Sequence, residues 1–517
     1  MSFDVVLRGG EIFDGTGAPP RRADVGIAGE RIDTVGDLSA AQAREVVDVT
    51  GLSVGPGFVD VHAHTDLVCF LGDEHVDVKA AGIRQGVTTE VPGNCGSSPF
   101  PVRGDDDPYL GAFGGRHRFE SVAEYRSALG REQLYANMAP LLGHGTVRAA
   151  VIGRDARPPT DDELAEMRRL VAQAMDEGAF GFSSGLIYAP GVYAQTEELV
   201  ALASEMRRHG RPYTTHMRDE GDHVTDAVAE ALRIGAEGGV AVQISHHKLA
   251  GKRNWGRSNE TLAQIEAARA AGTDVTIDVY PYTAGSTFLA AILPPWALDG
   301  GPNAMLERLK DSTSLDKIRS DFVEGLPGWQ SLVDLADWDS IVIAGEPPYA
   351  GHSIRELASN EGMDETTFVA RVLTENPGTL IILHMMREDE VRAIGDQPFA
   401  MVGSDGIPVP GQQHPRLAGT FARILNRHAS DDNALADAIR RMSNLPAQRF
   451  ALPDRGTIEA GKIADLVVFD RRTVTDRATY DEPLLYPSGI PHVLLGGKFA
   501  VRDGKLKSPA GRVLEPA

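Results

Sequence analysis

Short apolar runs that end in polar residues recur along the middle of the chain, and stretches with helical periodicity separate many of them. Eight runs read as buried strands because they are short and bounded by Gly, Pro or polar residues. They are residues 57–64, 86–93, 135–144, 179–186, 212–218, 240–248, 274–282 and 399–406. Residues 160–178 are typical of the intervening helices, with acidic residues at the start and Gly178 at the end. Strands alternating with helices predict an α/β fold, a (β/α)8 barrel of the TIM type.

The two ends of the chain have a different pattern, in which strand-like bursts alternate with Gly and Asp. Residues 1–55 and 450–517 share it, and it predicts a small β-sandwich domain built from both ends. The barrel would then span residues 56–449. One connection within it, about residues 286–398, is too long for a single helix and predicts an inserted subdomain over the barrel mouth.

The amino-acid composition and net charge restrict the kinds of molecule that the protein is expected to bind. The chain has 517 residues and a formal net charge of −22, which argues against nucleic acid because phosphate binding needs clusters of Lys and Arg. Its two cysteines, Cys69 and Cys95, cannot form a disulfide framework and favour the reducing cytoplasm. No signal-peptide pattern and no apolar run near the roughly 18 residues of a membrane span is found. We therefore expect a cytoplasmic protein without a membrane partner.

Metal-binding side chains gather at the predicted carboxyl ends of strands, where barrel active sites lie. His62 and His64 are two residues apart on the first strand, so they share a face and could chelate one metal. His216 and His246 end the fifth and sixth strands, and Asp405 follows the eighth. A lone His is more often structural, and an Asp between Gly-rich residues is often a turn residue. Two histidines, two further histidines and an aspartate at successive strand ends together indicate a metal site more specifically than any one of these residues does.

Cys95 lies in the turn sequence "EVPGNCGSS". Its neighbours are Asn and Gly, whereas Cys69 in "LVCFLG" is typical of a buried small hydrophobic residue. A thiolate binds Zn²⁺ well and can bridge two ions. A structural thiol or a nucleophile is the alternative, but a nucleophile needs an imidazole base, and the imidazoles here are already candidates for metal binding.

The order of these residues along the strands resembles the amidohydrolase superfamily. In its binuclear members a carbamylated Lys or a Glu on the third or fourth strand usually bridges the metals. The fourth strand here, "GFSSGLIYAPG", has neither residue at its end, which favours Cys95 as a ligand. Over nearly the whole chain, "GNCG", "THMRDEGD", "ISHHK", "YPYTAGST", "GSDG" and "HPRLAGTF" are similar to motifs of the D-aminoacylases, the N-acyl-D-amino-acid deacylases.

The resemblance implies roles for individual residues. The implied ligands are Cys95, His216 and His246 for a tightly bound Zn²⁺, with the pair His62 and His64 at a second, weaker position. Asp405 is a further candidate metal ligand. Asp405 would also be the catalytic acid and base. The implied substrate-binding residues are Tyr188, Tyr280 and Ser286, with Tyr282 as the residue most easily confused with Tyr280.

The expected substrate carries a carboxylate, for which Lys248 and Arg416 are the cationic candidates. We therefore expect zinc-dependent hydrolysis of N-acyl-D-amino acids to a carboxylate and a D-amino acid, with metal-activated water attacking the carbonyl and Asp405 carrying the proton. The alternatives are a cyclic-amide hydrolase of the dihydropyrimidinase or hydantoinase type, and an inactive barrel that acts as a binding protein. The sequence leaves open the preferred D-side chain, the acyl group and the oligomeric state.

Overall fold

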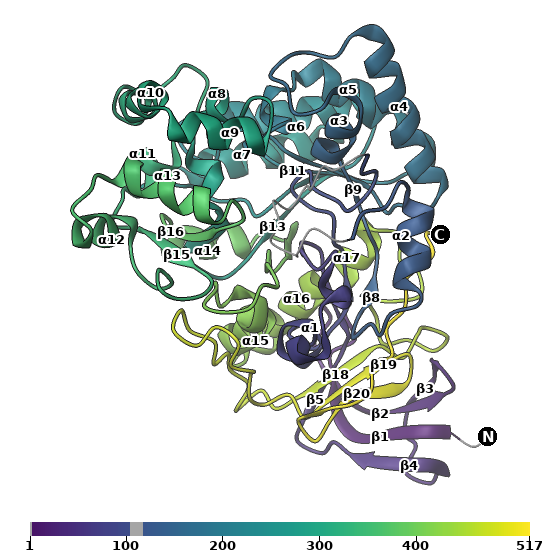
Figure 1. The fold of residues 1–517 in the computed structure, drawn as a ribbon. Coiled ribbons are helices and arrows are strands. Elements are labelled where there is room, and N and C mark those ends of the chain that lie inside the picture. The colour runs from purple at the N-terminus through teal and green to yellow at the C-terminus, as the bar shows by residue number, and fades with distance from the viewer. Residues whose placement is uncertain (1–2, 104–116) are drawn as a thin grey trace.

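A closed barrel of parallel strands forms the centre of the molecule (Figure 1). The computed structural model describes residues 3–103 and 117–517. In chain order the barrel strands are β6 (Phe58–Asp60), β7 (Val87–Glu90), β8 (Asn137–Met138) with β9 (Leu142–Gly143), β10 (Phe182–Gly185), β11 (Tyr213–His216), β12 (Val242–Ile244), β13 (Val275–Val279) and β17 (Ala400–Val402). Each lies within one of the eight predicted runs, so the predicted barrel is confirmed.

Hydrogen bonds outside the strands complete the ring. The third barrel strand is interrupted at Pro140, which has no N–H to donate, yet the N–H of Leu141 bonds to the carbonyl of Pro92 at 2.8 Å. The ring closes between β17 and β6, where the N–H of Asp405 donates to the carbonyl of His62 at 2.7 Å. The carboxyl ends of all barrel strands therefore lie at one face.

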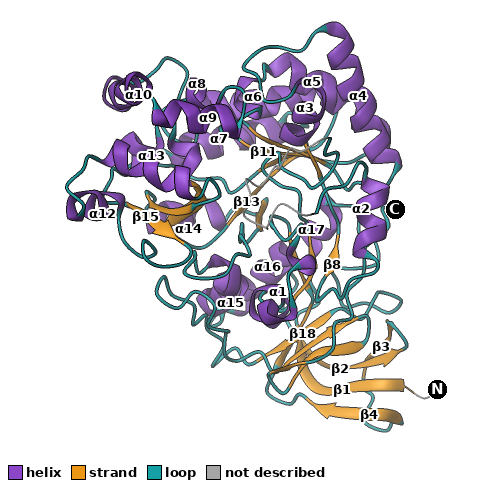
Figure 2. Ribbon diagram, viewed as in Figure 1, coloured by secondary structure: helices purple, strands orange, loops and turns teal. Residues whose placement is uncertain are grey.

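Helices cover the outside of the barrel (Figure 2). Helix α4 (Asp161–Asp176) begins with a capping box, in which the hydroxyl of Thr160 accepts from the N–H of Glu163 at 3.3 Å and the Glu163 carboxylate accepts from the N–H of Thr160 at 2.8 Å. The other helices from the barrel region are α1 (Val76–Lys79), α2 (Val122–Leu129), α3 (His144–Ile152), α5 (Thr196–Ala203), α6 (Val224–Gly238), α7 (Ser258–Ala270), α14 (Glu388–Gly395), α15 (Arg416–His428), α16 (Asp432–Met442) and α17 (Asn444–Arg449).

Both ends of the chain join one nine-stranded sheet, seen in Figure 1 as purple and yellow strands side by side. Its order is β21-β20-β19-β18-β5-β1-β2-β3, and β4 pairs with β1 as a branch. The two ends meet where β5 pairs antiparallel with β18. The bounds are β1 (Phe3–Ile12), β2 (Arg21–Ala28), β3 (Arg31–Gly36), β4 (Ala43–Asp48), β5 (Ser53–Pro56), β18 (Leu466–Phe469), β19 (His492–Leu495), β20 (Lys498–Arg502) and β21 (Lys505–Leu506).

A subdomain is inserted between β13 and β17. It has a three-stranded antiparallel sheet of β14 (Ala284–Phe288), β16 (Leu380–His384) and β15 (Ile341–Ala344). Its helices are α8 (Pro295–Leu298), α9 (Pro302–Lys310), α10 (Ser312–Glu324), α11 (Leu332–Ala336), α12 (Ile354–Asn360) and α13 (Glu365–Glu375). Helix α14 packs on β13, β17 and α7, so it belongs to the barrel layer although the sequence pattern grouped it with the insertion. None of the helices in the described residues has the length and apolarity needed to span a bilayer.

Candidate metal centre

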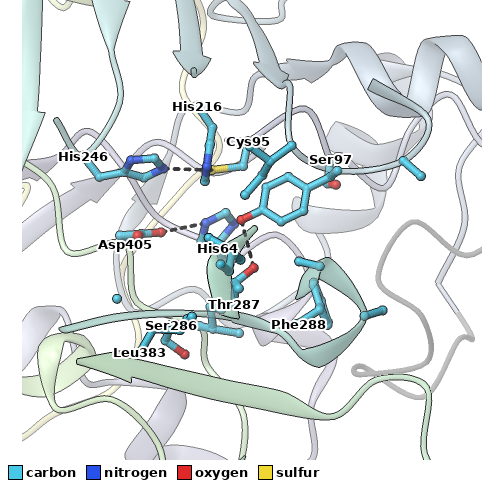
Figure 3. Close-up of a pocket in the computed structure, with 18 of the residues that line it drawn as sticks. His64, Cys95, Ser97, His216, His246, Ser286, Thr287, Phe288, Leu383 and Asp405 are labelled. Atoms are coloured by element: carbon cyan, nitrogen blue, oxygen red, sulfur yellow. Dashed lines mark hydrogen bonds and ion pairs between the residues drawn. The ribbon is translucent and has the colours of Figure 1, made fainter. Parts of the chain in front are cut away.

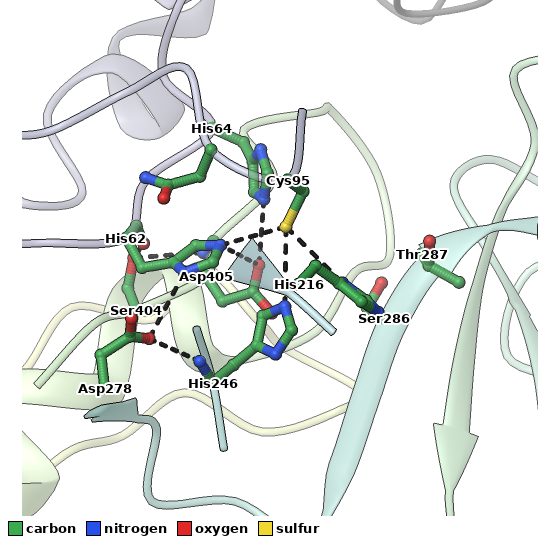
Figure 4. Close-up of polar contacts among 12 residues, drawn as sticks. His62, His64, Cys95, His216, His246, Asp278, Ser286, Thr287, Ser404 and Asp405 are labelled. Carbon is green, nitrogen blue, oxygen red and sulfur yellow. Dashed lines mark hydrogen bonds and ion pairs between the residues drawn. The ribbon is translucent and has the colours of Figure 1, made fainter. Parts of the chain in front are cut away.

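Cys95 lies at the centre of a buried cluster at the carboxyl ends of the barrel strands (Figure 4). Its Sγ lies 3.4 Å from Nε2 of His62, 3.7 Å from Nδ1 of His216 and 3.5 Å from Nε2 of His246. The four residues come from strands that are far apart in sequence, since each follows or ends a different barrel strand. The barrel therefore brings a thiol and three imidazoles together.

A second group of possible ligands shares Cys95 with the first. Nε2 of His64 lies 3.0 Å and Nε2 of His62 lies 3.4 Å from Oδ1 of Asp405. The donor atoms of His62, His64, Cys95 and Asp405 all lie within 4.8 Å of one another, and so do those of Cys95, His216 and His246. The thiol thus belongs to both groups of possible ligands.

The backbone at this centre is unusual. Cys95, His246 and Asp405 have φ values of 53°, 36° and 51°, and they are three of the six non-glycine residues with positive φ in the described chain. Non-glycine residues rarely adopt this conformation, and where they do the surrounding structure must hold them. At His246 the N–H donates to the carboxylate of Asp278 at 2.8 Å, which fixes the turn.

The end of the fourth strand explains why no bridging Lys or Glu is present there. Gly185 ends β10, and a Cβ on it would lie 2.1 Å from the carbonyl oxygen of Cys95. A Cβ on Gly96 would likewise lie 2.7 Å from the backbone nitrogen of Gly185. The turn that carries Cys95 occupies the space that a longer side chain on the fourth strand would need.

The donor atoms fit Zn²⁺. Zinc bonds to sulfur at about 2.3 Å and to nitrogen at about 2.0–2.1 Å, and a tetrahedral angle then separates S and N by about 3.5 Å. The three observed separations are 3.4, 3.5 and 3.7 Å. Burial alone would raise the pKa of the Cys95 thiol, but the charge of His62 and the imidazole hydrogen bonds outweigh it and hold that pKa well below its usual value. A thiolate is the form that binds metal.

Two carboxylates orient the imidazoles from behind, and the sequence reasoning did not select either of them. Oε1 of Glu220 lies 2.9 Å from Nδ1 of His246, whose Nε2 faces Cys95. Oδ1 of Asp278 lies 3.3 Å from Nδ1 of His62. Carboxylates in this position fix the tautomer and ring orientation of metal-binding histidines. The available signals were the spacing of Glu220 four residues after His216 and a lone carboxylate inside the apolar run "VTIDVY".

Lys248 and Arg416, the expected substrate cations, both sit in ion pairs. Nζ of Lys248 lies 2.5 Å from Oε1 of Glu220 and 2.8 Å from Nδ1 of His246. Nη1 of Arg416 lies 2.8 Å from Oδ2 of Asp405, and its Nη2 donates to the carbonyl of Ser286 at 3.0 Å. Lys248 lines the cavity beside the metal centre, whereas Arg416 lies behind it.

That cavity opens beside the two ligand groups and has a volume of about 140 Å³ (Figure 3). Tyr188, Tyr280 and Ser286 all line it, and the hydroxyl of Tyr188 lies 2.9 Å from that of Thr287. Tyr282 does not line it, because its ring packs against His414 and the guanidinium of Arg423. Of the two tyrosines that the sequence left open, Tyr280 is the one that faces the cavity.

A profile of the amidohydrolase family matches residues 45–302 and 351–501. The chain belongs to the amidohydrolase family. An N-acyl-D-glutamate deacylase and a D-aminoacylase, both from Alcaligenes xylosoxydans xylosoxydans, are each 39% identical over 99% of this chain and over 96% and 97% of their own lengths. These comparisons confirm the predicted resemblance.

Comparison with solved structures supports the same family assignment. The N-acyl-D-glutamate deacylase from Bordetella bronchiseptica, in complex with zinc and a phosphonate mimic of the tetrahedral intermediate, is 38% identical, with a TM-score of 0.84 over the full length of both chains. A D-aminoacylase is 38% identical with a TM-score of 0.85, over 99% of this chain and all of its own, and work on its binuclear metal centre describes activation by one metal and attenuation by a second. An Arthrobacter aurescens L-hydantoinase is only 17% identical with a TM-score of 0.55, which shows the shared fold alone.

Proposed function

We propose that this protein is a zinc-dependent N-acyl-D-amino-acid deacylase, which hydrolyses the amide bond to release a carboxylate and a free D-amino acid. The observation that carries the proposal is Cys95, shared by two groups of ligands beside Asp405 in the cavity wall. Full-length relatives with the corresponding activities support it. We assign catalysis to residues 56–449, treat residues 1–55 and 450–517 as the small domain, and propose the cytoplasm as the compartment because both cysteines are free thiols.

We assign the tight Zn²⁺ position to Cys95, His216 and His246, and a second, weaker position to His62, His64 and Asp405. Bound zinc polarises a carbonyl and lowers the pKa of water towards about 7. Three protein ligands would hold this ion, which is the number typical of catalytic zinc sites. The weaker position would share the Cys95 thiolate.

Asp405 is proposed to carry the proton. Burial would raise the pKa of its carboxyl, but Arg416 and His62 outweigh burial and hold that pKa well below its usual value. Asp405 therefore enters the reaction ionised and can accept a proton as water attacks the amide carbon. It then returns that proton to the nitrogen of the leaving amine as the C–N bond breaks.

The substrate carboxylate is assigned to the cationic and hydroxyl groups of the cavity wall. Lys248 and the hydroxyls of Tyr280 and Ser286 line the cavity, and Arg416 bonds to the Ser286 backbone from behind. If the amide carbonyl lies beside the ligand groups and the carboxylate lies here, the orientation of the third substituent of the α-carbon would be fixed. Three fixed points distinguish a D- from an L-amino acid.

The test is a rate comparison on protein with measured zinc content. We expect hydrolysis of N-acetyl-D-methionine, with little or none of N-acetyl-L-methionine, dihydrouracil or hydantoin. Faster turnover of the cyclic amides would favour the hydantoinase alternative. Stoichiometric zinc with no hydrolysis of any of these amides would favour the inactive binding protein.

A further inference from the structure

The turn that carries Cys95 has a backbone conformation that its surroundings must hold in place. Gly93 and Gly96, on either side, have φ values of 88° and 76°, and Cys95 itself has a φ of 53°. A non-glycine residue with positive φ persists only where the contacts around it fix the chain. The Sγ of Cys95 reaches three imidazoles from this turn. Whatever fixes the turn therefore also fixes the thiol.

A hydroxyl on the fourth barrel strand joins the two ends of this turn. Oγ of Ser183 donates to the carbonyl of Gly93 at 2.5 Å and accepts from the N–H of Gly96 at 3.0 Å. Strand β10, which carries Ser183, pairs with β9 and β11, whereas β7, which precedes the turn, pairs with β6 and β8. The hydroxyl therefore makes a contact that the strand pairing of the barrel does not supply.

Other hydrogen bonds of the turn use different groups. Nδ2 of Asn94 donates to the carbonyl of Val91 at 2.8 Å, and the N–H of Thr146 donates to the carbonyl of Gly96 at 3.3 Å. Neither bond involves the two groups that Ser183 joins. Both of those groups belong to buried residues. Loss of the hydroxyl would leave a buried donor and a buried acceptor without this partner, which is unfavourable unless the turn moves.

Resting on the proposed role of Cys95 as the shared zinc ligand, we propose that Ser183 is a positioning residue of the metal centre. Its hydroxyl holds the turn in the conformation that brings the Cys95 thiol to the imidazoles. It acts through the backbone on either side of Cys95 and supplies no ligand atom itself. The fourth strand thus contributes to zinc affinity through a hydroxyl that is bonded to backbone groups.

Ser184 provides a matched control, because it is the next residue on the same strand and both serines are fully buried. Successive side chains of a strand face opposite sides, so Ser184 faces away from the Cys95 turn. Its Oγ lies 2.6 Å from the hydroxyl of Tyr213 and 2.8 Å from that of Thr215. Removal of either serine hydroxyl breaks two buried hydrogen bonds, but only Ser183→Ala releases the turn.

The test compares Ser183→Ala with Ser184→Ala in the full-length protein, after circular dichroism and Tm show that both variants are folded. Competition with a chelator measures the dissociation constant of the tight zinc. We expect this constant to rise about 10- to 100-fold in Ser183→Ala and to keep its native value in Ser184→Ala. Replacement of zinc by Co²⁺ gives a second readout, because the thiolate-to-cobalt charge-transfer absorption reports the sulfur contact. We expect this band to weaken or shift in Ser183→Ala alone.

Native zinc affinity and a native cobalt band in Ser183→Ala would overturn the positioning role. Equal losses of affinity in the two variants would overturn it as well, because they would show a general effect on the barrel. The proposed function is tested separately on the native protein. Failure of the native protein to bind zinc or to hydrolyse N-acetyl-D-methionine would overturn that function and this inference together, whereas the first two outcomes would leave the function standing.

Discussion

Glu220 and Lys248 form a buried ion pair in which the same carboxylate oxygen also holds a candidate zinc ligand. Oε1 of Glu220 lies 2.5 Å from Nζ of Lys248 and 2.9 Å from Nδ1 of His246. Burial would raise the pKa of Glu220, but Lys248 and the neighbouring imidazoles outweigh it and keep that pKa below its usual value. One carboxylate thus orients the candidate metal ligand and restrains a cation that lines the cavity.

Glu220→Gln should weaken binding of the tight zinc. The amide has no charge to hold the His246 ring, and loss of such a carboxylate typically costs about 10- to 100-fold in metal affinity. Competition with a chelator measures the dissociation constant directly. Glu230→Gln is the control, because Glu230 is paired with Arg218 outside the two ligand groups and its loss should leave zinc affinity unchanged. Equal affinities for Glu220→Gln and the native protein would contradict the positioning role.

Asp278→Asn should act on the weaker metal position. Oδ1 of Asp278 faces Nδ1 of His62 and also accepts from the N–H of His246. An asparagine oxygen can still accept from that N–H, so the tight position should survive, while the contact with the His62 ring loses its charge. Titration with zinc should show the first equivalent retained and the second bound about tenfold more weakly or lost. Loss of the first equivalent with retention of the second would reverse the assignment of the two positions.

Asp405→Asn should keep most of the tight zinc and lose nearly all turnover. Asparagine keeps the shape of the side chain but cannot carry a proton, and removal of a general acid–base typically costs about 10²- to 10⁴-fold in rate. Zinc content and kcat are measured on the same preparation. A variant with native kcat would exclude Asp405 as the proton carrier. Asp437→Asn, on a carboxylate paired with Arg440 and Arg441 away from the centre, should keep native kcat.

Glu90 should make stability depend on pH. Burial raises the pKa of its carboxyl to about 8, and the negative charge of the nearby Asp60 adds to the rise. Between the ordinary value of 4.5 and about 8, the folded protein holds a proton that the unfolded chain has released. The free energy of unfolding therefore falls as pH rises through this window, and this contribution is constant above it.

Glu90→Gln removes this titration, so its Tm relative to the native protein should increase as pH rises from 5 to 8. Thermal unfolding at fixed zinc concentration measures the difference. Glu266→Gln, at an exposed position, should show a pH-independent difference. A Glu90→Gln curve that runs parallel to the native curve over this range would show that the carboxyl is ionised in the folded protein.

The barrel could be predicted from the sequence because each barrel strand is a buried apolar run that ends in a polar residue. This pattern is visible in the local sequence of each strand. The break in the third strand follows from Pro140. Helix α14 was misplaced because nothing in its own sequence shows that it packs on β13 and β17.

The candidate site was predicted in part. Cysteine, histidine and aspartate side chains at strand ends can be recognised one at a time in the sequence. Cys95, the four histidines and Asp405 were predicted in this way, and the structure brings them together. Glu220 and Asp278 were missed because their importance depends on the rings they face, which is a property of the fold. The ion pair between Arg416 and Asp405 could not be predicted from the sequence either, because it depends on how helix α15 packs against the barrel.

The zinc content of Cys95→Ala, purified beside Cys69→Ala, tests the central claim most directly. Both cysteines are buried, but only Cys95 faces imidazoles, whereas Cys69 belongs to the hydrophobic core. We predict that Cys95→Ala loses its tightly bound zinc and its activity, while Cys69→Ala keeps stoichiometric zinc. Full zinc content in folded Cys95→Ala would contradict the assignment of this thiol as the shared metal ligand.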